Sequence, residues 1–123
     1  MNVSLGKVFA KELRNYPPED RLKILGFIAH VKEHSFHGLE GRNKESHHVD
    51  RNDPDFIVKV KFAIDNNLWH YHIGIVMYDM SKPFGDRTSE YVLHYMMASS
   101  QNTKIVDLSA HPPFRFPSSS YLD

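Results

Sequence analysis

The sequence contains no cysteine, which excludes disulfide bonds, thiolate metal ligands and cysteine nucleophiles. It also has no excess charge of either sign, because 15 lysines and arginines balance 15 aspartates and glutamates. Binding to nucleic acid must therefore depend on local cationic patches. No apolar run approaches the roughly 20 residues of a membrane-spanning helix, and the charged, amphipathic N-terminus does not have the pattern of a signal peptide. We therefore expect a cytoplasmic protein that does not associate with membranes.

Histidine, by contrast, is abundant. The chain has nine histidines among 123 residues, and histidine is the side chain whose charge changes near neutral pH. A hydrophobic fraction of 41% at this length indicates a single globular domain over residues 1–123. Within it we expect a helical hairpin at 1–34, a sheet at 55–111 and an irregular tail at 112–123.

The first 34 residues are predicted to form two antiparallel helices. Apolar residues recur at helical spacing over 4–16, with Ser4 as the N-cap. Pro17 and Pro18 end this helix and begin the next, which is expected to end near His34. The predicted buried stripe of the second helix is Leu22, Ile24, Leu25, Ile28 and Val31.

Four strands are predicted after the hairpin. Residues 56–64 (FIVKVKFAI) and 68–76 (LWHYHIGIV) alternate between apolar and polar side chains and are separated by a turn at 65–67. Residues 91–98 and 104–111 complete the set, while 35–54 and 77–90 are predicted loops. The connections are too short for helical crossovers. The predicted fold class is therefore α+β, with two N-terminal helices packed on one face of a four-stranded, mostly antiparallel sheet.

This alternation predicts a basic surface on the sheet face opposite the helices. Side chains on a strand point alternately to its two faces, so Lys59, Lys61, His70 and His72 would share that face. The other predicted members are His94, Ile105, Asp107, Ser109 and His111, whereas Val106 and Leu108 are assigned to the core.

Such a surface has the groups needed to cleave RNA through its 2′-hydroxyl. A base must remove the 2′ proton, an acid must protonate the 5′ oxygen, and cations must stabilise the charged phosphorane. The simpler alternative is that these lysines and histidines are ordinary solvated residues. His70 and His72 could also bind a metal, although no third ligand is fixed by local spacing. Asp107, Ser109 and His111 lack the glycine-rich turn of a nucleophilic triad.

The order of elements, the K-V-K motif, the segment LWHYHIG and the basic residue after the last strand resemble the RelE/ParE superfamily of bacterial toxins. Residues 69–73, 86–95 and 105–111 are most similar to its YafO branch, and the likeness spans roughly residues 5–116. RelE-like members pack two N-terminal helices on an antiparallel sheet and cleave messenger RNA on the ribosome without a metal. The resemblance therefore implies the toxin of a type II toxin–antitoxin pair.

The resemblance also implies roles for individual residues. The expected catalytic set is His111, His70, His72, Lys59, Lys61 and Arg115, and the expected RNA-binding set is Arg87 and His94. His111 would be the general acid or base, supported by His70 or His72, and the cations would stabilise the phosphorane. No cofactor and no metal are expected, and the expected partners are a cognate antitoxin, the ribosome and messenger RNA.

The zero net charge departs from the basic character of many such toxins. It favours an alternative, in which the chain is a ParE-like or other non-catalytic RelE-fold protein that binds or inhibits a protein target.

Overall fold

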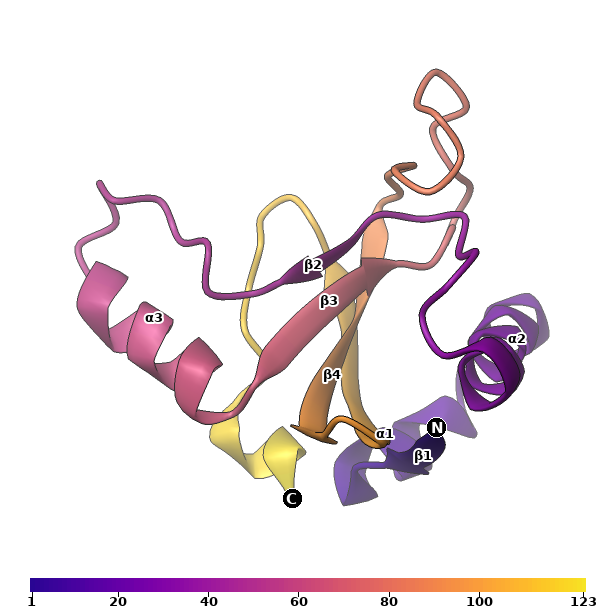
Figure 1. The fold of residues 1–123 in the computed structure, drawn as a ribbon, viewed down its shortest axis with the longest axis horizontal. Helices are drawn as coiled ribbons and strands as arrows, with labels where there is room; N and C mark the ends of the chain where they lie inside the picture. The colour runs from indigo at the N-terminus through magenta and orange to yellow at the C-terminus, as the bar shows by residue number, and fades with distance from the viewer.

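The computed structural model describes residues 1–123 and has the predicted α+β class (Figure 1). In chain order the elements are β1 (Asn2–Leu5), α1 (Lys7–Leu13), α2 (Pro18–His34), β2 (Asn43–Glu45), α3 (Phe56–Asp65), β3 (Leu68–His72), β4 (Tyr91–Ser99), β5 (Asn102–Ala110) and the 3-10 helix η1 (Ser119–Leu122). None of the helices combines the length and the apolar character needed to cross a bilayer.

The sheet has five strands rather than four, in the order β1-β5-β4-β3-β2. β1 pairs parallel to β5, and the other neighbours are antiparallel, so the sheet is mixed. The prediction of one helix over 4–16 is wrong at its start, because residues 2–5 form a strand beside β5. β2 lies in a predicted loop: three polar residues at a sheet edge carry no apolar alternation that could reveal them.

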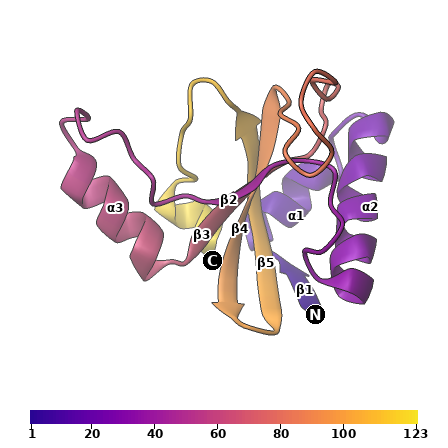
Figure 2. The ribbon, with the colours of Figure 1, turned by 45° about the horizontal axis from the view of Figure 1, so that its top comes forward.

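Helices α1 and α2 cover one face of the sheet, as predicted (Figure 2). The residues of α2 that face the sheet follow the helical spacing i, i+3, i+4, i+7: Ile24, Phe27, Ile28 and Val31. Phe27 stacks on Tyr71 of β3 with 4.9 Å between ring centroids. Leu22 and Leu25 were predicted to be buried but are 70% and 52% exposed, because they fall off this face of the helix. The hydrophobic core joins this helix face to Phe9, Tyr71, Ile73, Ile75, Leu93, Tyr95 and Ile105.

Residues 56–65 form helix α3, which contradicts the predicted strand. The apolar residues at alternate positions do not share a buried face: Val58 and Ile64 are 70% and 53% exposed, and the buried residue of the helix is Ala63, which is not one of them. β3 already has β4 on one edge and β2 on the other, so no edge remains for another strand beside it. In a helix, successive residues turn by about 100°, so residues two apart point in nearly opposite directions. Lys59 and Lys61 therefore point in different directions from α3, and neither lies on the sheet face that carries the histidines.

A β-bulge in β5 changes the predicted distribution of its side chains. His94 of β4 is opposite Asp107 and Tyr95 is opposite Ile105, so Val106 is an extra residue. Ile105 consequently packs in the core under α1 and α2, against the prediction that it lies on the other face. Beyond the bulge, Ser109 hydrogen-bonds to His94 and so lies on the predicted side of the sheet.

The second face of the sheet is partly covered by α3 and by the C-terminal segment (Figure 2). The tail is irregular over 112–118 but then forms η1. The end of the tail is attached to β5 and to α1. Lys104 Nζ of β5 donates to the Leu122 carbonyl at 2.7 Å, and the Tyr121 hydroxyl donates to Glu12 of α1. The face predicted to be open is thus the floor of a cleft.

The chain passes very close to β3 at Gly41, just before β2. A Cβ atom added to Gly41 would lie 1.9 Å from the His72 carbonyl oxygen, which no side chain can tolerate. We expect Gly41→Ala to lower the free energy of unfolding by about 2 kcal/mol or more. Gly26→Ala is the matched control, because nothing lies within 4 Å of a Cβ there and the residue is inside α2.

The control substitution should stabilise the protein by about 0.5–1 kcal/mol, since alanine favours helix over glycine. Urea denaturation of the two variants measures both effects. Equal stability of Gly41→Ala and wild type would contradict the close approach.

Candidate active site

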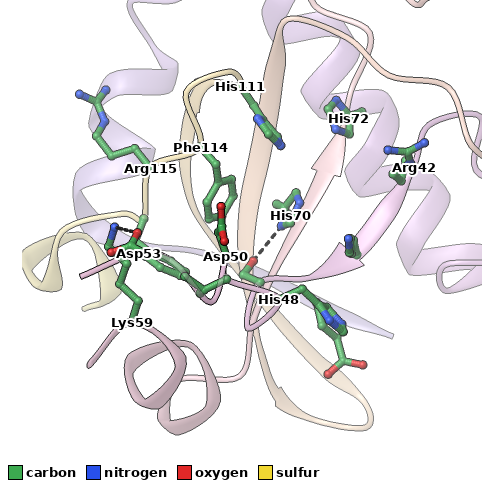
Figure 3. Close-up of a pocket in the computed structure, with 15 residues that line it drawn as sticks. Arg42, His48, Asp50, Asp53, Lys59, His70, His72, His111, Phe114 and Arg115 are labelled. Carbon is green, nitrogen blue, oxygen red and sulfur yellow. Dashed lines mark hydrogen bonds and ion pairs between the residues drawn. The ribbon is translucent and has the colours of Figure 1, made fainter. Parts of the chain in front are cut away.

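A cleft with a volume of about 530 Å³ lies between α3, strands β2 and β3 and the C-terminal segment (Figure 3). We call it the α3 cleft. Its lining includes four histidines, four cations, three carboxylates and two phenylalanines: His48, His70, His72, His111, Arg42, Lys44, Lys59, Arg115, Glu45, Asp50, Asp53, Phe114 and Phe116.

Four imidazoles form a histidine cluster at one wall of this cleft. His70 and His72 come from β3, His94 from β4 and His111 from the residue after β5. His111 lies 5.5 Å from His72 and 5.9 Å from His70 between ring centroids, and His94 lies 6.4 Å from His70. Phe114 of the C-terminal segment packs against three of the rings, at 4.7 Å from His70. The sheet thus brings together all four histidines predicted for this face.

Hydrogen bonds fix three of the four rings. The Ser46 hydroxyl lies 2.9 Å from His70 Nδ1, and the Ser109 hydroxyl lies 2.7 Å from His94 Nε2. His72 Nδ1 lies 3.0 Å from both the backbone N–H and the carbonyl of Ser89. Nδ1 of His94 and Nδ1 of His111 are both buried without a hydrogen-bond partner, and His111 alone of the four makes no hydrogen bond through either ring nitrogen. Its ring is therefore held by packing alone.

Burial favours the neutral form of every member of the cluster. Removal from water lowers the pKa of His70 and of His94 to about 3, and the neighbouring histidines add to the effect. Burial also lowers the pKa of His72, against a hydrogen bond to Ser89 that favours its charged form. The pKa of His111 is lowered by burial and by the nearby charges of Lys44 and Arg42. Neutral imidazoles can accept a proton, which is what a general base must do.

Cationic groups adjoin these neutral rings. Arg42 makes two hydrogen bonds to Asp86, at 2.6 and 3.2 Å, which leaves most of the five guanidinium donors free. Lys59 Nζ lies 2.6 Å from Asp53. Lys44 and Arg115 make no ion pair and are available to an anion.

Other residues predicted for the site lie elsewhere. Lys61 pairs with Asp65 on the exposed side of α3, with 74% of its side chain exposed, and does not line the cleft. Arg87 is paired with Glu40 at 2.8 Å and is also outside the cleft. His94, which was predicted to contact RNA, is fully buried behind the lining residues. His94 is therefore placed to support other rings and not to touch a ligand.

The sequence did not reveal several residues that line the α3 cleft. Arg42, Lys44 and Ser46 come from a polar stretch predicted to be a loop, in which only a three-residue strand forms. Phe114 lies in the proline-rich tail, where the sequence gives no periodicity. The one available signal was the pair Phe114 and Phe116, two phenylalanines on either side of Arg115 in a tail rich in proline and serine.

No group of three His, Asp or Glu side chains is arranged to hold a metal ion. Comparison of the chain with protein-family models, curated proteins and solved structures finds no match.

The buried imidazoles should make the fold sensitive to mild acid. In the unfolded chain His70 and His94 bind protons below about pH 6.5, whereas in the folded protein they remain neutral down to about pH 3. The unfolded state therefore binds more protons between these values, and stability falls as the pH falls. The slope is about 1.4 kcal/mol per pH unit for each histidine. Asp107 acts in the opposite direction, because burial raises its pKa to about 6.

His70→Asn isolates one contribution, because the asparagine amide can still hydrogen-bond to Ser46 where Nδ1 does. Urea denaturation between pH 5 and 7 should show a shallower loss of stability in His70→Asn than in wild type. Identical slopes would show that His70 titrates normally in the folded protein.

Proposed function

We propose that the chain is a metal-free endoribonuclease that cleaves messenger RNA on the ribosome through attack of the 2′-hydroxyl. The observation that carries this proposal is the presence of three imidazoles and an arginine with free donors in one cleft. His70, His72 and His111 supply proton acceptors and donors, and Arg42 supplies charge for a phosphate. These are the groups that the reaction requires.

The biological context of the proposal is the toxin of a type II toxin–antitoxin pair, similar to RelE and most similar to the YafO branch. Two N-terminal helices on one face of the antiparallel strands β3, β4 and β5 support a RelE-like arrangement. Strands β1 and β2 and helix α3 extend that arrangement. On this basis the partners are a cognate antitoxin, the ribosome and messenger RNA, in the cytoplasm.

In the proposed reaction, His72 and His111 form the acid–base pair. Both rings begin neutral, and one of them removes the proton from the 2′-hydroxyl as the 2′ oxygen forms a bond to the adjacent phosphorus. The bond from phosphorus to the 5′ oxygen breaks as this proton passes to that oxygen, from the ring that took it or through the neighbouring ring. The products are a 2′,3′-cyclic phosphate and a 5′-hydroxyl. Stacking at 5.5 Å allows both rings to reach one phosphate from the same side of the cleft.

The other polar groups support this pair. Arg42 and Lys44 lie close enough to His111 to lower its pKa, so they are placed to stabilise negative charge on a phosphate held there. Arg115 and Lys59 line the same cleft from the tail and from α3. His70 fixes the position of the pair by contact with both rings, and Ser46 fixes His70.

Exposed apolar residues favour the alternative, a non-catalytic protein that binds a protein target. Val76, Met77, Met80 and Phe84 lie on the segment between β3 and β4 and are 59–73% exposed. Ile57 and Val58 of α3 are 78% and 70% exposed. Apolar side chains gathered on a surface are typical of protein-binding sites. They suit an antitoxin or a ribosomal contact equally well, so they do not oppose the enzyme.

Removing the imidazole of His111 should abolish most of the activity. A general acid or base contributes about 10²- to 10⁴-fold to a rate, so we expect His111→Ala to reduce cleavage by that factor. The measurement is cleavage of messenger RNA in a translation reaction, quantified by primer extension. His34→Ala is the control, because His34 lies at the exposed end of α2, away from the cleft. Full activity of folded His111→Ala protein would remove this residue from the mechanism.

The two lysines of α3 make a second matched pair. Both form an ion pair of 2.6 Å with an aspartate, but Lys59 lines the α3 cleft and Lys61 does not. We expect Lys59→Ala to lower the cleavage rate about tenfold, which is the effect of losing one charge-assisted hydrogen bond. Lys61→Ala should cleave at the wild-type rate. An equal loss in both variants would contradict a specific role for Lys59 in the cleft.

A further inference from the structure

A second cleft, with a volume of about 540 Å³, lies on the other side of the histidine cluster. It is bordered by the segment between β3 and β4 and by the start of the C-terminal segment, and we call it the loop cleft. Met77, Tyr78, Asp79, Thr88, Glu90 and Pro112 contribute to its lining. Clefts of this size hold molecules as large as a nucleotide.

The two clefts share three lining residues, namely Arg42, His72 and His111. These side chains therefore stand at the junction of two spaces, each large enough for a nucleotide. In Figure 3, His72, His111 and Arg42 lie together at one end of the α3 cleft. In single-stranded RNA, a phosphate likewise joins two nucleotides.

We infer that single-stranded RNA lies across both clefts, with one nucleotide in each and the phosphate between them at the junction. The inference extends the proposed function by naming where the nucleotides on the two sides of the cleaved phosphate bind. Binding of RNA across the two clefts can be measured whether or not the protein cleaves RNA.

The charges of the loop cleft support this placement of the phosphate. Asp79 and Glu90 are the ionised groups that line it besides Arg42 at the junction. Carboxylates repel a phosphate but accept hydrogen bonds from the amino and imino groups of a base. A nucleotide in this cleft should therefore present its base to the carboxylates and its phosphate to Arg42.

The α3 cleft offers aromatic surface for the other nucleotide. Phe114 and Phe116 lie 5.2 Å apart between ring centroids and both line the cleft. Bases of single-stranded RNA commonly stack on aromatic side chains, with little dependence on sequence. Lys44 and Arg115, which make no ion pair, are available to the next phosphate along the strand.

Two exposed methionines allow the loop cleft to be tested separately. Met77 and Met80 belong to the same segment and are 73% and 66% exposed, but only Met77 lines the cleft. Met77→Glu would add a negative charge to the loop cleft, close to the phosphate that the inference places at the junction, without altering the histidines or Arg42. Met80→Glu adds the same charge outside the cleft and is the control.

The probe is a fluorescein-labelled 2′-O-methyl RNA hexamer of random sequence, which cannot undergo attack by a 2′-hydroxyl. Its dissociation constant is measured by fluorescence anisotropy. We expect Met77→Glu to weaken binding at least about tenfold, because like charges in contact across an interface are strongly unfavourable. Met80→Glu should remain within about twofold of wild type. His48→Glu, at an exposed position in the α3 cleft, should weaken binding as Met77→Glu does.

Equal affinity of Met77→Glu and Met80→Glu would overturn the inference, and so would a failure of the wild-type protein to bind the hexamer. Cleavage assays on unmodified RNA separate this result from the proposed function. If wild-type protein cleaves RNA but Met77→Glu binds the hexamer normally, only the two-cleft inference fails. If Met77→Glu alone weakens binding and wild-type protein cleaves nothing, the inference stands and the proposed nuclease fails.

Discussion

The arrangement of the candidate site depends on one close crossing, where the chain at Gly41 passes against the end of β3. The space there is filled by backbone, so the His72 carbonyl lies where a side chain of residue 41 would be. The Tyr78 hydroxyl donates to that carbonyl at 2.7 Å and lies 2.9 Å from the Tyr71 hydroxyl. The His72 N–H donates to the Arg42 carbonyl at 3.0 Å. This crossing places Arg42 beside His72 and starts β2 along the edge of β3, which fixes one wall of the α3 cleft.

Burial of the four imidazoles is the second constraint, and it connects stability with chemistry. Rings within 5.5–6.4 Å of one another pack without mutual repulsion only while they are uncharged. Phe114 excludes water from them, and the tail that bears Phe114 is anchored through Lys104 and Tyr121 to the opposite end of the molecule. The same desolvation that keeps the rings neutral makes a protonated ring a stronger acid than an imidazolium in water. In the proposed reaction this favours the return of the proton to the leaving oxygen.

The sequence predicted the histidine face because that face depends on a period of two within β3 and β4. The alternation within each strand was enough to place His70, His72 and His94 on this face. Helix α2 was also predicted from local sequence, because its prolines mark where it begins. The failure at 56–65 has a different origin. A short apolar run fits a strand and a helix equally well, and the choice is made by the neighbours of β3, which the local sequence does not contain.

The remaining errors come from features too small to leave a pattern. One extra residue at Val106 reverses the side chains that precede it, and three polar residues suffice for β2. Arg42 and Lys44 reach the site through that short strand. Their contribution depends on tertiary contact alone, so no spacing in the sequence could have placed them beside His111.

Zero net charge agrees with phosphate recognition once the distribution of charge is considered. Asp86 and Asp53 pair with Arg42 and Lys59, so two carboxylates near the cleft orient cations and leave donors of Arg42 free. Electrostatic attraction is then confined to the few groups near the histidines.

With so few phosphate contacts the electrostatic part of RNA binding is small, because that part scales with the number of phosphates neutralised. The proposed enzyme must therefore gain affinity from stacking in its clefts and from apolar contacts with a larger partner. The exposed apolar residues of α3 and of the segment between β3 and β4 are the surface available for such contacts.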